Sequence, residues 1–60
     1  MTRLQQIVMA VHEIDSTIEP GLIVEVAQEM VADSDNQADT VRWLRTADVA
    51  EVAAVIAEQF

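Results

Sequence analysis

The chain has no cysteine, lysine or tyrosine, and its 60 residues include only one glycine, one proline and one histidine. The absence of cysteine excludes disulfides and thiolate metal sites, and a lone histidine disfavours a histidine-based metal centre. His12 has no second histidine or cysteine as a partner, and there is no glycine-rich loop. Neither Ser16 nor Ser34 lies in a nucleophile-elbow context, so the sequence offers no recognisable arrangement for nucleophilic or acid–base catalysis. We therefore expect a protein that is not an enzyme and that uses no cofactor or metal.

Long hydrophobic runs are missing as well. No apolar stretch approaches the roughly 18 residues that a membrane span requires. The first 15 residues interrupt every short apolar run with polar positions and hold one arginine and two acids, which fits neither a secretory signal nor a mitochondrial presequence. The sequence predicts a cytoplasmic protein without membrane contact.

Basic residues are scarce, because three arginines face eleven acids and leave a net charge of −8. Five of the acids, and no basic residue, fall between residues 19 and 35. A field of this sign repels nucleic acid and favours basic partners. It also keeps a small domain dispersed in solution, which is the simpler interpretation.

The length limits how much core the chain can build. A hydrophobic content of 52% argues against disorder and indicates one small domain over residues 1–60. A domain of this size buries only about 60% of its unfolded surface, so its stability is marginal. Disulfides, metals or oligomerisation usually compensate, and the composition leaves oligomerisation. We expect a homo-oligomer, with a dimer favoured.

Four segments carry the apolar periodicity of helices, and none carries a strand pattern. The first follows a capping box formed by Thr2 and Gln5 and ends near Asp15. Its apolar face is expected to contain Leu4, Ile7, Val8, Val11 and Ile14.

The second segment, from Pro20 to about Ala32 or Asp33 after the N-cap Glu19, has apolar residues on most sides. Val24 and Val31 widen its apolar arc to roughly 200°, whereas an ordinary surface helix needs about 100°. We therefore expect it to contact neighbours on two sides, either helices of its own chain or a second copy.

The third helix is expected from Asp35 to Arg45, capped by Ser34 with Gln37 in a capping box, and Thr46 is the expected N-cap of the fourth. Together the segments predict an all-α fold, a compact bundle of four short helices that is completed by oligomerisation. The expected core face of the fourth helix contains Val49, Val52, Ala53, Ile56 and Phe60.

The acidic turn from Asp33 to Asp39 invites comparison with a calcium-binding EF-hand loop. That loop needs glycine at its sixth position and a bidentate glutamate at its twelfth. Ala38 and Leu44 occupy these positions here, so a polar turn with a helix cap explains the run better.

The six residues from Thr40 to Arg45 resemble the end of a recognition helix in helix-turn-helix DNA-binding domains. The preceding segment is acidic, lacks glycine and is too long for the usual turn, and the arginines are too few for phosphate contacts. A protein interface fits better, because tryptophan and arginine are enriched at interface hot spots. The alternatives are that Trp43 anchors the core and that Arg42 pairs with Asp39.

Three functions follow. The first is a non-catalytic helical module for protein–protein interaction and assembly that self-associates. The second is a small acidic inhibitor, or nucleic-acid mimic, that occupies a basic surface of a partner, as some small phage-encoded proteins do. The third is a small DNA-contacting regulator, which the charge disfavours. The candidate interaction residues are Val24, Val31, Arg42, Trp43 and Arg45.

Overall fold

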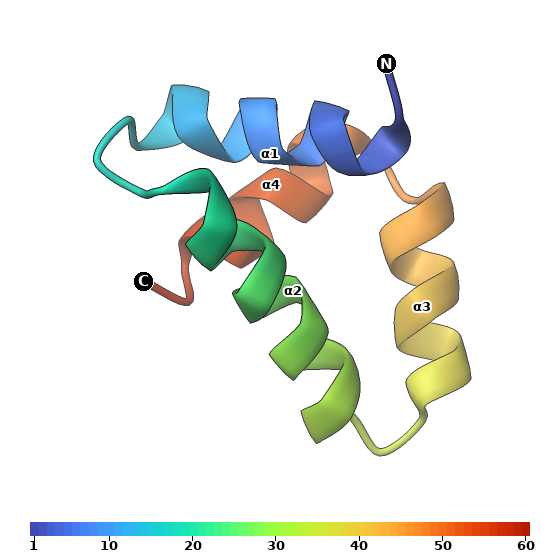
Figure 1. Cartoon of the computed structure of the whole chain (residues 1–60). Helices are drawn as coiled ribbons and strands as arrows, with labels where there is room; N and C mark the ends of the chain where they lie inside the picture. Colours follow the sequence, from blue (N-terminus) through green and yellow to red (C-terminus); the bar gives the residue numbers. More distant parts are fainter.

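The computed structural model describes all 60 residues and contains four α-helices and no strand. Figure 1 shows α1 lying across α4. The second helix, α2, runs away from this pair, and α3 runs from the far end of α2 back toward the start of α1. The predicted all-α bundle is confirmed. In chain order the helices are α1 (Arg3–Ile14), α2 (Pro20–Asp33), α3 (Gln37–Thr46) and α4 (Val49–Ala57).

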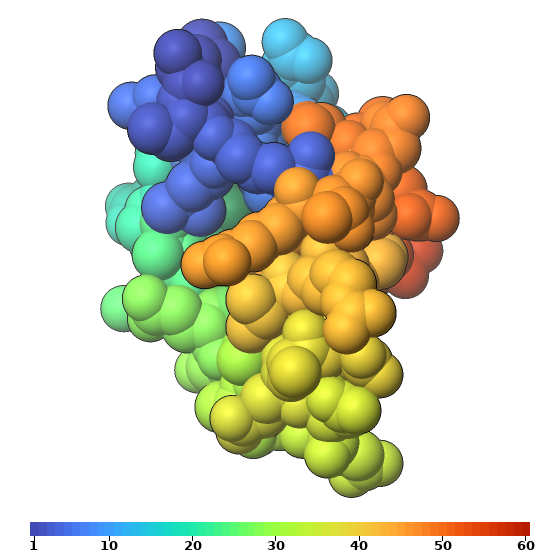
Figure 2. Space-filling view, turned by 90° about the vertical axis from the view of Figure 1, so that its right-hand side faces the viewer, coloured from blue at the N-terminus to red at the C-terminus, as the bar shows by residue number.

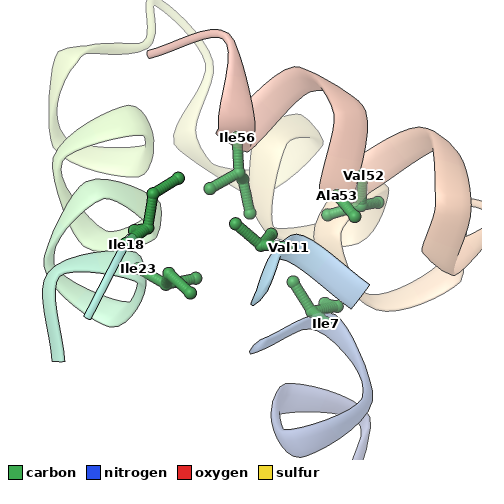
Figure 3. Packing of buried hydrophobic residues seen from close by; sticks show 7 residues of the cluster. All are labelled: Ile7, Val11, Ile18, Ile23, Val52, Ala53 and Ile56. Atoms are coloured by element: carbon green, nitrogen blue, oxygen red, sulfur yellow. The ribbon is translucent and has the colours of Figure 1, made fainter. Parts of the chain in front are cut away.

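The core lies where α1, α4 and the start of α2 meet. The most extensive packing is between α1 and α4, and α3 contributes no fully buried residue. Each isoleucine or valine side chain buried here contributes roughly 1.5–3 kcal/mol. Figure 3 shows the buried side chains of the core cluster converging from these helices and from the turn before α2: Ile7, Val11, Ile18, Ile23, Val52, Ala53 and Ile56.

The second helix packs against all three others, so helices of its own chain supply neighbours of the kind that its wide apolar arc leads us to expect. Only Ile23 of this helix is fully buried, however. Val24 and Val31 remain half-buried, so the chain alone does not cover the whole arc.

The first two helices begin as predicted. Thr2 and Gln5 form the capping box, with Gln5 N–H donating to Thr2 Oγ1 at 3.2 Å and Thr2 N–H donating to Gln5 Oε1 at 2.9 Å. Pro20 occupies the first position of α2, where its missing N–H costs no hydrogen bond. Glu19 is the N-cap residue, although its side chain makes no capping bond.

The predicted cap of the third helix is wrong. Asn36 is the N-cap, and its Oδ1 accepts from the N–H of Asp39 at 3.2 Å. The hydroxyl of Ser34 instead donates to the carbonyl of Val31 at 2.8 Å. Because α2 continues to Asp33, Ser34 is needed to end that helix and cannot start the next one.

The predicted cap of the fourth helix is also wrong, for the same reason. Asp48 is the N-cap, and its carboxylate accepts from the N–H of Ala50 at 2.9 Å. Thr46 is the last residue of α3, and its hydroxyl donates to the carbonyl of Arg42 at 2.7 Å.

Three residues predicted for the core faces are about half exposed: Leu4 at 49%, Ile14 at 55% and Phe60 at 50%. At 1.5 Å per residue the 12 residues of α1 span about 18 Å, whereas the nine of α4 span about 14 Å. The shorter helix therefore leaves both ends of the apolar face of α1 uncovered. Phe60 lies three residues beyond the end of α4 and has lost the helical register that would turn it inward.

Candidate interaction surface

A shallow apolar groove runs between the N-terminal half of α1 and one flank of α2, and we call it the α1–α2 groove. It has a volume of about 540 Å³. Methionines contribute strongly, with Met1 exposed at 77% and Met9 at 51%. Flexible, polarizable methionine side chains are common on surfaces that adapt to a protein partner. The groove is lined by Met1, Leu4, Gln5, Val8, Met9 and Val24.

Leu4 also lines a second depression, the central hollow, so the two concave regions are adjacent. The central hollow has a volume of about 250 Å³ and reaches the core residues Ile7, Ile23 and Ile56. Neither lining contains an acidic residue, although the chain carries eleven acids. The central hollow is lined by Arg3, Leu4, Ile7, Ile23, Ala27, Leu44, Arg45 and Ile56.

The side chain of Arg3 joins the start of α1 to the end of α3. Its Nε donates to the carbonyl of Leu44 at 2.9 Å, and a terminal nitrogen donates to the carbonyl of Ala47. These carbonyls lie at the C-terminal end of α3, where a positive charge is favoured by the helix dipole. Figure 2 shows the N-terminal segment of the chain lying against this end of α3. Arg3 is thus a structural connection.

A third depression, which we call the Trp43 hollow, lies where the end of α2, the start of α3 and the end of α4 come together. Its volume is about 440 Å³. Unlike the other two, it has carboxylates in its lining, from Asp33 and Asp39. Its lining residues are Met30, Asp33, Ser34, Asp39, Thr40, Trp43, Val55 and Gln59.

The structure distributes the predicted interaction residues over separate surfaces. Val24 lines the α1–α2 groove, Arg45 lines the central hollow and Trp43 lines the third hollow. Val31 is half-buried and lines none of them, and Arg42 forms an exposed ion pair with Asp39 at 3.6 Å.

Trp43 is partly buried against the core cluster and also lines a hollow, and its role at an interface stays a prediction. Met1, Leu4 and Met9, which dominate the α1–α2 groove, are absent from the set predicted from the sequence. Their exposure depends on which side of α1 the other helices cover, and no local sequence pattern predicts that side.

Three polar side chains, those of His12, Asp15 and Thr17, form hydrogen bonds in the turn after α1. His12 Nδ1 lies 3.2 Å from the carbonyl oxygen of Ile18. The carboxylate of Asp15 accepts from the hydroxyl of Thr17 at 2.5 Å and from its N–H at 3.0 Å. Both bonds lower the pKa of Asp15, and the hydroxyl bond has the larger effect. No group of three or more histidine or acidic side chains in the structure is placed to hold a metal ion.

Comparison of the chain with protein-family models, with curated proteins and with solved structures finds no match. None of the four helices has both the length and the apolar character needed to cross a bilayer.

Proposed function

We propose that this chain is a non-catalytic helical interaction module of the cytoplasm that self-associates through the α1–α2 groove, with a dimer as the basic unit. The observation that carries the proposal is the exposed apolar lining of this groove on a domain in which only seven of 60 residues are fully buried. A core this small gains from a partner that covers further apolar surface.

The charge distribution supports the same surface. Two copies that each carry a net charge of −8 repel one another at most orientations. The α1–α2 groove and the central hollow have no acid in their linings and include two of the three arginines. Contact there brings apolar surfaces together without placing carboxylates opposite carboxylates. Association should therefore persist, or strengthen, when salt screens the remaining repulsion.

The test is the solution mass by light scattering at low and high salt, for the unchanged chain and two matched variants. Met9→Glu places a charge in the groove, whereas Ile14→Glu places one at an equally exposed position outside it. We expect a dimer for the unchanged chain and for Ile14→Glu, and a monomer for Met9→Glu. A monomeric unchanged chain at micromolar concentration, or equal behaviour of the two variants, would contradict the proposal.

A second candidate function is that of a small acidic protein that occupies a basic surface of a partner. One observation favours it: the end of α2, the turn after it and the start of α3 carry Asp33, Asp35 and Asp39 close together in the chain. Asp33 and Asp39 line the hollow that contains the only tryptophan. Binding of this kind weakens steeply as salt rises, unlike apolar packing between helices.

A further inference from the structure

We propose that the Trp43 hollow is a binding site for a guanidinium or ammonium side chain, presented by an arginine or lysine of a basic partner protein. The inference rests on the second candidate function. It is independent of self-association, because none of the residues that line this hollow lines the α1–α2 groove or the central hollow.

The first support is the indole of Trp43, whose position is set by the core. Trp43 is half-buried and packs against the core cluster while lining the hollow. Tryptophan is the aromatic side chain that attracts cations best. Met30 and Val55 add apolar walls, along which the methylene stem of an arginine or lysine can pack while its charged end remains near the carboxylates.

The second support is the negative potential at one side of the hollow. Asp33 is the last residue of α2, where the helix dipole is already negative, and the last turn of this helix contains no basic residue. A carboxylate at that position is unfavourable for the helix itself. A cation bound in the hollow would therefore be attracted by the helix end, by Asp33 and by Asp39 together.

The third support is that the groups already present leave the site accessible. Arg42 contacts Asp39 at 3.6 Å, but both side chains are largely exposed, and such a pair is weak and easily exchanged. No basic residue lines the hollow. Its volume of about 440 Å³ lies within the range of sites that accept small ligands or single side chains.

The experiment uses Trp43 as its own reporter, because the chain has one tryptophan and no tyrosine. The full chain is titrated with a short arginine-rich peptide at low salt, and a lysine-rich peptide is compared with it. We expect a saturable change in Trp43 emission, with an affinity that falls as salt is added. A basic peptide that binds elsewhere leaves the emission unchanged.

Two pairs of variants separate the site from the overall charge. Asp33→Asn with Asp39→Asn should weaken peptide binding about three- to fivefold, as expected for the loss of two exposed charge contacts. Glu13→Gln with Glu25→Gln removes the same charge outside the hollow and should change the affinity for the peptide by less than about twofold. Gln59→Lys adds a cation at the hollow, whereas Gln28→Lys adds the same charge on the exposed surface of α2, so only the first should compete with the peptide.

The outcomes distinguish the site from the function. Equal effects within both matched pairs would overturn the Trp43 hollow as the binding site and leave the acidic function standing. No binding by the unchanged chain at low salt would reject both. Because Gln59 is exposed, its variant keeps the test valid if the double aspartate variant fails to fold, which circular dichroism reveals.

Discussion

At the scale of single residues, the three arginines show how little a side chain's identity says about its role. Arg3 holds the end of α3, Arg42 pairs with a neighbour on its own helix, and Arg45 lines the central hollow. The pairing of Arg42 with Asp39 follows from their spacing and is confirmed. The partners of Arg3 lie 41 and 44 residues away, so no local pattern could identify them.

The turn after α1 makes a prediction about pH. Hydrogen bonds from Thr17 lower the pKa of Asp15 in the folded chain, so this carboxylate stabilises the fold above its unfolded pKa. The contribution is lost as the pH falls through the folded pKa. Thr17→Val removes the hydroxyl bond and should raise the pKa of Asp15 toward the ordinary range of an aspartate. An NMR titration of the Asp15 carboxyl, in the unchanged chain and in Thr17→Val, measures this pKa.

The control for this titration is Thr46→Val, which removes a hydroxyl remote from Asp15 in the chain and should leave that pKa unchanged. If Thr17→Val also leaves it unchanged, the hydroxyl bond is not the main cause of the lowered pKa.

At the scale of elements, the turn between α2 and α3 contains two residues that could cap a helix. The first three amides of a helix have no acceptor within it, and Asn36 supplies one for the amide of Asp39. Asn36→Ala should therefore speed hydrogen exchange at the amide of Asp39 and lower the free energy of unfolding by about 1 kcal/mol.

Ser34→Ala serves as the comparison, because Ser34 bonds to the carbonyl of Val31 and not to α3. It should leave exchange at Asp39 unchanged. If Ser34→Ala speeds exchange at the amide of Asp39 and Asn36→Ala does not, the N-cap of α3 is Ser34, as the sequence pattern indicates.

The number and type of the helices could be predicted from periodicity, and the starts of α1 and α2 from Thr2 and Pro20. The starts of α3 and α4 could not. Each connecting turn offers two capping residues, Ser34 or Asn36 and Thr46 or Asp48. The choice depends on how far the preceding helix continues, which is decided by packing and not by the turn itself.

At the scale of the whole molecule, the core is a single cluster shared by α1, α4 and the start of α2, so these elements should unfold together. Ile56 is completely buried in this cluster, whereas Ile14 on α1 is 55% exposed. Ile56→Val should lower the free energy of unfolding by about 0.5–1.5 kcal/mol, while Ile14→Val should change it by less than about 0.5 kcal/mol.

Urea denaturation at one fixed protein concentration measures both variants, because association would otherwise shift the apparent stability. Equal losses would mean that Ile14 is covered in solution, for example by a second copy.

The candidate surfaces were only partly predictable at this scale. The excess of apolar surface on α2 leads to the proposal of self-association, and the acidic charge leads to the proposal of a basic partner. The groove itself lies on the flank of α1 that faces α2, where Leu4, Val8 and Met9 line it together with Val24. That arrangement becomes visible only when the two helices are placed together.

The hydrogen bonds of Arg3 also bear on the order in which the chain folds. They join residues far apart in sequence, and closing so long a loop is costly in entropy while the chain is open. Once α1 has packed on α4, the end of α3 is already held nearby, because only two residues separate α3 from α4. The bonds then form at little further cost, so we expect Arg3 to slow the opening of the finished bundle more than it speeds its assembly.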